Sequence, residues 1–421
     1  MNFENLEKNI LQIGRQAKEA SRYVSQLSTN FKNKILCSAA ENLLKNKDII
    51  LKANELDIKE NKDKLNSATL DRLILDEKRI ESISNGLEEI SKLEDPVGKI
   101  IENWSRPNGL KIEKISIPLG VIGVIYESRP NVSADAAGLC LKSGNAIILR
   151  GGSESFHSSS KIVEIINRSY ENFKLPAGVL QYIPTKDRSA VGHLLKMDNF
   201  VDVIIPRGGR SLIERVINES KVHVIRHLDG ICHTYIHKSS IASLSQEVVI
   251  NAKMRRPGIC GATETILIDK EVLSTHLPDI IKSLTEMNCE VRGDEHVLGI
   301  NNSLKLANEE DWHTEYLDKI VSIKTIFKGV EEAVNHINLY GSGHTDAILS
   351  EDEDAVNFFL NNVDSGIVMH NTSTQFADGG EFGMGAEIGI STSKVHARGP
   401  VGVAQLTSFK YKVKGSGQIR P

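Results

Sequence analysis

Hydrophobic and polar positions divide the chain into a helical beginning and a longer region in which strands and helices alternate. Within residues 1–100, apolar side chains recur at alternating spacings of four and three, at Leu6, Ile10, Ile13, Ala17, Ala20, Val24 and Leu27. This spacing places one apolar stripe along a helix. Because the repeat stops at Leu27, we expect a helix packed on a domain rather than an isolated coiled coil.

From about residue 102 the pattern becomes that of strands. Turn residues at 107–109 predict a hairpin over 102–117, which leads into a buried strand at Val121–Ile125. A short apolar run typical of a strand covered on both faces follows at 146–149, and strands at 179–183 and 201–205 continue the pattern. Helical stretches separate these runs, so the pattern predicts a parallel sheet with helices on both faces.

Later segments give more specific predictions. A second α/β region follows Gly230, and Ser211 with Glu214 three residues on predicts a capping box at the start of a helix. The tail predicts one exposed strand, Leu406–Val413, with alternating apolar residues. An unpaired strand edge favours self-association, for which the segment 102–117 offers a partner hairpin.

Composition narrows the class of protein. The 421 residues predict two or three domains. The 51 basic and 55 acidic residues give a net charge of −4, which provides no field for nucleic acid or an anionic membrane, and neither partner is expected. No run approaches the ~20 apolar residues of a membrane span, and early charges argue against a secretory signal. Five scattered cysteines without metal-ligand spacing indicate reduced thiols in a cytoplasm and no metal site.

Two junctions between a strand and a helix carry paired glycines, Gly151-Gly152 and Gly208-Gly209. Glycine lets a backbone approach a ligand closely, and the following helix N-terminus offers N–H groups to phosphate. Neither pair forms the G-x-G-x-x-G fingerprint, and each by itself is also explained as a tight turn. Both stand at the same end of parallel strands, where α/β sheets bind ligands, so the phosphate interpretation stays open.

Cys260 is the sharpest chemical candidate. It lies in KMRRPGICGATE, where a Pro-Gly pair ends a helix and forces a loop, and Arg255 and Arg256 precede it. Nearby positive charge favours the thiolate, which is the reactive form of cysteine. The motif alone also permits a small apolar side chain in a core, which is our interpretation of Cys140 and Cys232.

The glycine-rich segment Asn371–Ile390 has two interpretations. It is either a flexible surface loop or a lid or pocket wall that presents backbone amides to a ligand. The residues of the segment do not decide between them.

Around the glycine pairs, the Cys260 loop and the glycine-rich segment, the sequence resembles the gamma-glutamyl phosphate reductases (glutamate-5-semialdehyde dehydrogenases). These enzymes are a family of the aldehyde dehydrogenase superfamily. The matching motifs are VIGVIYESRPNVSADAAGLCLKSGNAIILRGG (121–152), VDVIIPRGGRSLI (201–213), HLDGICH (227–233), NAKMRRPGICGATET (251–265), YGSGHTDAIL (340–349) and AEIGISTSKVHARGPVG (386–402). They follow one another in order from about residue 115 to 410, so the resemblance covers most of the chain.

The resemblance implies an α/β, aldehyde dehydrogenase-like fold with three parts. These are a Rossmann-type NADP(H)-binding domain over 1–101 and 118–229, an α/β catalytic domain over 230–398, and a small β oligomerisation element formed by strands in 102–117 and 399–421. A homodimer or homotetramer is implied as well.

Carried over to the matching positions, the resemblance makes Cys260 the nucleophile. Arg129 or Asn131, in SRPN, lies where the superfamily places its oxyanion-hole asparagine. Two positions depart from the commoner pattern, because Gly261 replaces an asparagine and Gln375 replaces an arginine. These departures concern one polar contact near the thiol and one substrate contact.

Three residues are candidates for substrate binding. Arg255 and Arg256 suit the phosphate group, since arginine forms charge-assisted bidentate contacts. Asn371, at the start of the glycine-rich segment, is the third.

The resemblance also implies a set of cofactor-binding residues, namely Arg150, Gly151, Gly152, Ser153, Gly208, Gly209 and Glu315. Arg150 stands in the place of a ribose-binding lysine, Gly208 opens the helix that faces the pyrophosphate, and Glu315 resembles the glutamate that holds the nicotinamide ribose. Ser153 stands where NAD-preferring members carry a glutamate that repels a 2′-phosphate, so NADPH is expected. Glu154, one position later, bears on the same choice.

The implied reaction is the NADPH-dependent reduction of L-glutamyl 5-phosphate to L-glutamate 5-semialdehyde and phosphate through a Cys260 thioester, the second step of proline biosynthesis. A glutamate kinase is a candidate partner. The alternative is a non-phosphorylating NAD(P)-dependent aldehyde dehydrogenase, whose hydrolytic glutamate begins an E-L-G-G motif. The matching position here is His227, which carries no carboxylate.

Overall fold

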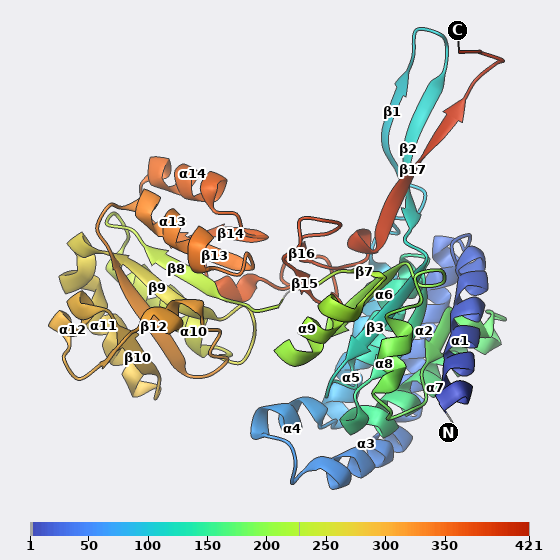
Figure 1. Cartoon of the computed structure of the whole chain (residues 1–421), viewed down its shortest axis with the longest axis horizontal. Coiled ribbons are helices and arrows are strands. Elements are labelled where there is room, and N and C mark those ends of the chain that lie inside the picture. The colour runs from blue at the N-terminus through green and yellow to red at the C-terminus, as the bar shows by residue number, and fades with distance from the viewer. Residues whose placement is uncertain (1–2, 227, 421) are drawn as a thin grey trace. The chain divides into compact units, whose positions relative to one another are not determined.

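The computed structural model describes residues 3–226 and 228–420, which form two compact units (Figure 1). The first unit comprises residues 1–226, 383–389 and 401–421, and the second comprises 227–382 and 390–400. Residues 383–389, which fall within the expected range 230–398, cluster with the first unit. No helix in the described ranges has the length and apolar character needed to cross a membrane.

The first unit is built on a five-stranded parallel sheet. Its strands, in spatial order, are β5 (Leu180–Tyr182), β4 (Ala146–Gly151), β3 (Val121–Tyr126), β6 (Val203–Arg207) and β7 (His223–Val224). Ile122 and Val124 point into one apolar core, whereas Val121 and Ile125 point into another. Because alternate residues of a strand face opposite sides, the sheet is covered on both faces, as the apolar runs predict.

Helices cover both faces of this sheet. They are α1 (Phe3–Val24), α2 (Thr29–Lys45), α3 (Lys47–Asn61), α4 (Ser67–Leu73), α5 (Glu77–Lys92), α6 (Val132–Lys142), α7 (Phe156–Asn172), α8 (Ser189–Leu194) and α9 (Arg210–Glu219). The predicted apolar stripe of α1 is confirmed, since Leu6, Ile10 and Ala17 enter one core and Ala20 and Val24 the other.

The predicted capping box at Ser211 is wrong. α9 begins at Arg210, and its N-cap is Gly209, which has no side chain to cap the helix. Glu214 accepts a hydrogen bond from Arg210 Nε at 2.8 Å, one turn away. The Glu127 carboxylate, just after β3, accepts the N–H of Gly209 at 2.8 Å. A residue distant in sequence therefore satisfies this helix end, which a local motif could not reveal.

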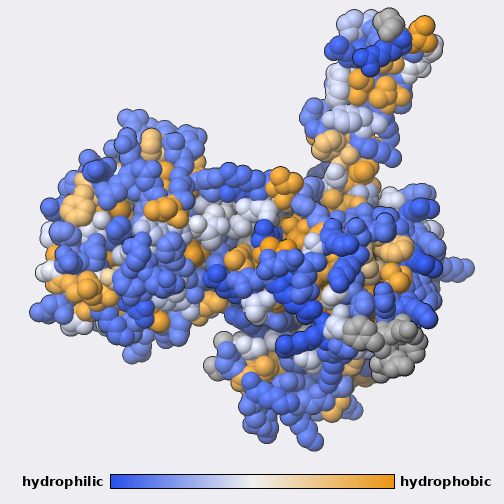
Figure 2. Space-filling model, viewed as in Figure 1, coloured by the Kyte–Doolittle hydropathy of each residue, from blue (hydrophilic) through white to orange (hydrophobic). Residues whose placement is uncertain are grey.

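A three-stranded antiparallel sheet extends from the first unit (Figure 1). Its order is β1 (Ile100–Ser105), β2 (Lys111–Pro118) and β17 (Thr407–Lys414), which confirms the predicted hairpin and tail strand. β17 pairs with β2 of the same chain, so the hairpin covers one edge of the tail strand internally and not from another copy. Phe409 and Val413 are exposed, and Figure 2 shows apolar side chains among polar ones on this sheet.

The second unit holds a seven-stranded parallel sheet. Its order is β11 (Lys305–Leu306), β10 (Glu290–Gly293), β12 (Ile320–Ile326), β9 (Thr263–Asp269), β8 (Cys232–Ile236), β13 (Thr345–Leu349) and β14 (Ile367–His370). The helices are α10 (Ala242–Met254), α11 (Leu273–Glu286), α12 (Glu295–Ile300), α13 (Val330–Tyr340) and α14 (Glu353–Asn362). Ile266 and Ile268 pack in one core and Leu267 in another, so this sheet is also covered on both faces. A two-stranded sheet joins β15 (Ile390–Ser391) to β16 (Gly399–Pro400).

Candidate active site

Cys260 lies in the loop between α10 and β9, and it is partly exposed. A Cβ added to Gly230 would lie 2.2 Å from the carbonyl oxygen of Cys260 and 2.6 Å from its Cα. No side chain fits at these distances, so glycine is required at 230. The Cys232 thiol donates to the same carbonyl oxygen at 3.1 Å. Contacts from Gly230, just before β8, and from Cys232, its first residue, thus fix the backbone of Cys260.

The other cysteines differ from Cys260 in their surroundings. Cys140 and Cys232 are buried, as predicted, and burial raises the pKa of both thiols. A buried neutral thiol is unreactive. Cys37 is exposed and its Sγ lies 3.5 Å from Ser91 Oγ. Cys260 therefore combines partial exposure with a loop whose backbone is fixed.

Glu315 lies in the same unit, on the loop before β12. Its carboxylate accepts a hydrogen bond from the backbone N–H of Gly230, the residue that packs against Cys260. Burial raises the pKa of Glu315. Because β12, β9 and β8 are neighbours, Glu315, Cys260 and Gly230 stand before the amino ends of three adjacent strands.

In the first unit, three loops leave the carboxyl ends of adjacent strands. β3 lies between β4 and β6, so the loops that begin near Glu127, Gly152 and Gly208 share one edge of the sheet. A Cβ on Gly152 would lie 2.2 Å from Glu154 Oε1, and one on Gly208 would lie 2.4 Å from Glu127 Oε2. At each junction the glycine leaves space that an anionic oxygen of the chain fills. The same spaces suit the phosphate oxygens of a dinucleotide, and we expect such a ligand to displace the carboxylates.

Comparison with known proteins gives the same fold and a more specific relationship. The model of the aldehyde dehydrogenase family matches residues 4–299. The gamma-glutamyl phosphate reductase of Paramagnetospirillum magneticum is 52% identical over 422 residues, covering 100% of both chains. That of Brucella anthropi is 53% identical and covers 97% of this chain and 96% of its own. The crystal structure of the Thermotoga maritima enzyme superimposes with a TM-score of 0.95 at 39% identity, covering 98% of this chain and 100% of that one.

The chain belongs to the gamma-glutamyl phosphate reductase family. It is thereby also a member of the aldehyde dehydrogenase family, an oxidoreductase family that uses nicotinamide dinucleotides. The resemblance drawn from the motifs is confirmed, and so is the fold class.

The two departures from the commoner superfamily pattern lie close together. A Cβ on Gly261 would lie 3.2 Å from the Thr374 carbonyl oxygen, so a larger side chain there requires a shift of the neighbouring turn. Gln375, which is buried, donates through Nε2 to the carbonyl oxygens of Ala252 at 3.0 Å and Arg256 at 3.3 Å. Gln375 thus holds the C-terminal end of α10 through two hydrogen bonds. The absence of a side chain at Gly261 leaves space for the turn that contains Gln375.

Two of the three substrate candidates line one pocket. Arg255 and Asn371 both border a pocket of about 340 Å³, together with Glu247, Glu381 and neighbouring residues of α10 and the 371–376 segment. Arg255 Nη1 also donates to Gln375 Oε1 at 3.4 Å. Arg256 is exposed and is not among the described residues that line this pocket. The first part of the glycine-rich segment Asn371–Ile390 therefore lines a pocket, whereas residues 383–389 cluster with the first unit.

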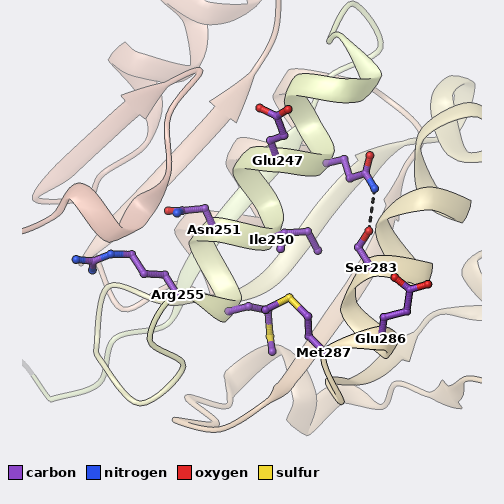
Figure 3. Close-up of a pocket in the computed structure, with 9 residues that line it drawn as sticks. Glu247, Ile250, Asn251, Arg255, Ser283, Glu286 and Met287 are labelled. Atoms are coloured by element: carbon purple, nitrogen blue, oxygen red, sulfur yellow. Dashed lines mark hydrogen bonds between the residues drawn. The ribbon is translucent and has the colours of Figure 1, made fainter.

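A larger groove of about 780 Å³ lies between α10 and α11 and contains few of the predicted residues (Figure 3). Gln246 Nε2 donates to Ser283 Oγ across it at 2.8 Å. In Figure 3, Arg255 and Asn251 extend from α10 away from Glu286 on α11. Both also line the smaller pocket, which contains Asn371 as well and is the better substrate candidate.

The predicted ribose contact Arg150 is buried and engaged with backbone. Its guanidinium donates to the carbonyl oxygens of Gly151, Lys186 and Asp187, the last two at 3.3 and 3.2 Å. It therefore joins the loops that follow β4 and β5. Arg150 therefore has a structural role in addition to its positive charge.

Glu154 turns back towards the loop after β3. Its Oε1 accepts from Ser128 N–H at 2.7 Å and from Ser128 Oγ at 2.8 Å, and its Oε2 accepts from Ser153 Oγ at 3.3 Å. Ser128 has a φ of 44°, a conformation that non-glycine residues rarely adopt. Glu154 thus stabilises the turn that leads into Arg129 and Asn131. Sequence reasoning missed this role, and that of Glu127, because contacts with segments distant in the chain leave no local signal in the sequence.

The two oxyanion-hole candidates have different surroundings. The amide of Asn131 donates to Asp135 Oδ2 at 2.9 Å, and Asn131 stands at the N-cap position of α6. Arg129 is partly buried, and its carbonyl oxygen accepts the N–H of Val132 at 3.1 Å. Both residues lie in the first unit, whereas Cys260 lies in the second.

Proposed function

We propose that this protein reduces L-glutamyl 5-phosphate to L-glutamate 5-semialdehyde with NADPH, as the second step of proline biosynthesis in the cytoplasm. The strongest support for this proposal is the setting of Cys260. Cys260 is a partly exposed thiol on a loop held by Gly230 and Cys232, in a family whose curated members are named for this reduction.

Cys260 performs the covalent chemistry. Its thiolate Sγ attacks the acyl phosphate carbonyl, the C–S bond forms, and the C–O bond to phosphate breaks so that inorganic phosphate leaves with the electron pair. The nicotinamide cofactor, when bound, supplies the hydride that reduces the thioester carbon. The C–S bond then breaks, the aldehyde leaves, and Cys260 returns as a thiolate.

Several residues support these steps. Backbone N–H groups of the cysteine loop, with Arg129 or Asn131, stabilise the developing oxyanion, at ~3 kcal/mol for each donor. Glu315 holds the nicotinamide ribose. The glycine pairs at 151–152 and 208–209 face the phosphates, with Ser153 and Arg150 at the adenosine ribose.

The pocket beside α10 suits the amino-acid end of the substrate. Arg255 and Asn371 line this pocket and provide a cation and an amide, and Arg256, outside the pocket, remains with Arg255 a candidate for the phosphate group. Glu247 and Glu381, which line the same pocket as Arg255, have the charge that an ammonium group requires.

The alternative is a non-phosphorylating aldehyde dehydrogenase. Its hydrolytic carboxylate would stand at His227, which lies outside the described residues, and the sequence there offers an imidazole instead. The deciding experiment runs the reaction in reverse, with glutamate 5-semialdehyde and NADP⁺. Without a hydrolytic base the thioester waits for phosphate, so we expect steady NADPH formation only when inorganic phosphate is present. Steady turnover in phosphate-free buffer would favour the alternative.

Replacement of the nucleophile tests the covalent step. Cys260→Ser should abolish turnover in both directions while nucleotide binding, measured by calorimetry, stays within a few-fold of the wild type. Cys37→Ser, which changes an exposed thiol in the other unit, is the matched control and should keep full activity. Full activity of Cys260→Ser would end the proposal of a thioester.

We also propose self-association through the three-stranded sheet, as a homodimer or homotetramer. Removal of residues 404–421 is a poor test, because Leu406 is fully buried and its carbonyl oxygen accepts from Asn145 Nδ2 at 2.9 Å. Phe409→Lys with Val413→Lys changes two exposed side chains of β17 instead. We expect this variant to sediment as a smaller species that remains folded. An unchanged oligomer would contradict the proposed surface.

A glutamate kinase that delivers the acyl phosphate is a proposed partner, and co-sedimentation of the two proteins tests this.

A further inference from the structure

A buried ion pair joins the two ends of the segment that contains Cys260. Lys253, in the last turn of α10, pairs through Nζ with Oε2 of Glu264 in β9, and both side chains are fully buried. Burial raises the pKa of Glu264 to about 8, while the Lys253 ammonium acts in the opposite direction. Desolvation makes such pairs weak sources of stability, so stability alone does not explain why this one is present.

Glu264 also holds the loop that carries Glu315. Its second oxygen, Oε1, accepts the N–H of Leu317 at 3.3 Å. Leu317 has a φ of 53°, which leucine rarely adopts, and it is 43% exposed, so side-chain packing does not enforce this conformation. Beside it, the Tyr316 ring lies 5.9 Å from the Lys253 ammonium. The ion pair therefore contacts two neighbouring residues of the Glu315–Leu317 turn, Tyr316 and Leu317.

These contacts connect the turn to the nucleophile by two routes. Through the backbone, Lys253 and Glu264 stand at the two ends of the segment that contains Cys260. Through space, Glu315 accepts the N–H of Gly230, whose α-carbon lies against Cys260. A shift of Glu264 would therefore change the positions of both Glu315 and Cys260.

We infer that Glu264, neutralised by Lys253, is a positioning residue that sets the 314–318 loop relative to the Cys260 loop. The inference rests on the proposed function, in which Glu315 holds the nicotinamide ribose. In that setting a correctly placed Glu315 matters for hydride transfer and not for attack by the thiol. Glu264 acts through Oε1, which accepts the N–H of Leu317, and the Lys253 ammonium compensates the buried charge of the carboxylate.

The first measurement uses the wild-type protein without substrate. Hydrogen exchange at single-residue resolution should show the amide of Leu317 protected by roughly 100-fold or more relative to a surface amide. This protection is expected despite the exposed side chain of Leu317. Exchange at the rate of an unprotected amide would overturn the inference without any variant.

The second measurement compares two double variants. Lys253→Met with Glu264→Gln removes both charges but keeps a carbonyl oxygen for the Leu317 N–H. Lys253→Met with Glu264→Leu removes the charges and the acceptor together. Replacing both partners avoids an unpaired buried charge, so both variants should melt within a few degrees of the wild type. Only the leucine variant should lose protection at Leu317, by roughly 10-fold. Equal protection in the two variants would overturn the inference.

A kinetic measurement separates this role from a structural one. In phosphate-free buffer with glutamate 5-semialdehyde and NADP⁺, the initial burst of NADPH reports addition of the thiol to the aldehyde followed by hydride transfer, without release of the acyl group. The leucine variant should slow this burst by roughly 10-fold, with a matching rise in the deuterium isotope effect, while the glutamine variant stays within about 3-fold. Equal burst rates in both variants would overturn the inference. No burst in the wild type would instead refute the proposed function, and the exchange data would still decide on Glu264.

Discussion

The two units place their candidate residues at opposite edges of parallel sheets. In the first unit, the glycine pairs follow the carboxyl ends of β4 and β6 and lead into helices. In the second unit, Cys260 and Glu315 precede the amino ends of β9 and β12. The carboxyl edge is where helix N-termini offer N–H groups to anions, which suits the phosphates of a dinucleotide. The amino edge has no such property.

This difference shows how each unit handles negative charge. α10 ends at Met254, shortly before the cysteine, so the Cys260 loop follows a helix C-terminus, whose dipole disfavours an anion. The first unit, by contrast, already holds the Glu127 carboxylate at the start of α9 and the Glu154 carboxylate on Ser128, beside the two glycine pairs. The second unit is prebuilt around Cys260, whereas we expect ligand phosphates to displace the two carboxylates of the first unit.

The largest effect should come from a methyl group at Gly230. Gly230→Ala places a Cβ within 2.2–2.7 Å of the carbonyl oxygen, Cα and Cβ of Cys260, all of which are rigidly held. Displacement of the nucleophile by a fraction of an ångström should lower kcat/KM by roughly 100-fold, or ~2.7 kcal/mol. Gly152→Ala in the first unit meets only the flexible end of Glu154, so its loss should stay below about 5-fold.

The matched control for this contrast is Gly299→Ala. Gly299 lies in α12 of the second unit, and a Cβ there would meet nothing within 4 Å. Alanine is also the better helix former, so stability should rise slightly and activity should not change. A Gly230→Ala enzyme with wild-type kcat/KM would show that the cysteine loop is adaptable, and the contrast between the two units would fail.

The same contrast explains what the sequence could predict. Apolar runs predicted the strands of the first sheet, turn residues predicted the hairpin, and alternating apolar residues predicted the tail strand, because each of these signals is local in the sequence. Motifs identified Cys260 and the glycine pairs. Contacts between distant segments had no such signal: Glu127 at the N-terminus of α9, Glu154 on Ser128, and Lys253 with Glu264 all depend on the assembled fold. The failed capping box at Ser211 has the same cause.

Cofactor choice provides an intermediate effect, in the first unit. Ser153 lies on the loop after β4 and donates to Glu154, whose carboxylate is turned towards Ser128. Ser153→Glu would add a second carboxylate that is free to meet a 2′-phosphate. We expect kcat/KM for NADPH to fall by roughly 10-fold, or ~1.4 kcal/mol, while the value for NADH is spared. Ser153→Gln, similar in size but neutral, should leave the ratio near that of the wild type. Equal use of both cofactors by the wild type would already contradict the expected preference for NADPH.

The smallest effect should come from Glu127, which tests whether the first unit exchanges a carboxylate for a phosphate. Glu127 Oε2 accepts the N–H of Gly209 at 2.8 Å, at the helix end proposed to face the pyrophosphate. Its charge stabilises that helix end in the free protein and repels an arriving phosphate, so it opposes binding twice. Glu127→Gln keeps an acceptor of the same shape without the charge. Calorimetry should show NADP⁺ binding tightened by about 3-fold, or ~0.65 kcal/mol, with the gain shrinking as salt is added. Glu214→Gln, on the same helix and paired with Arg210, is the control and should change affinity less. Weaker binding of NADP⁺ by Glu127→Gln would mean that the carboxylate belongs to the nucleotide site, and the first unit would then be as prebuilt as the second.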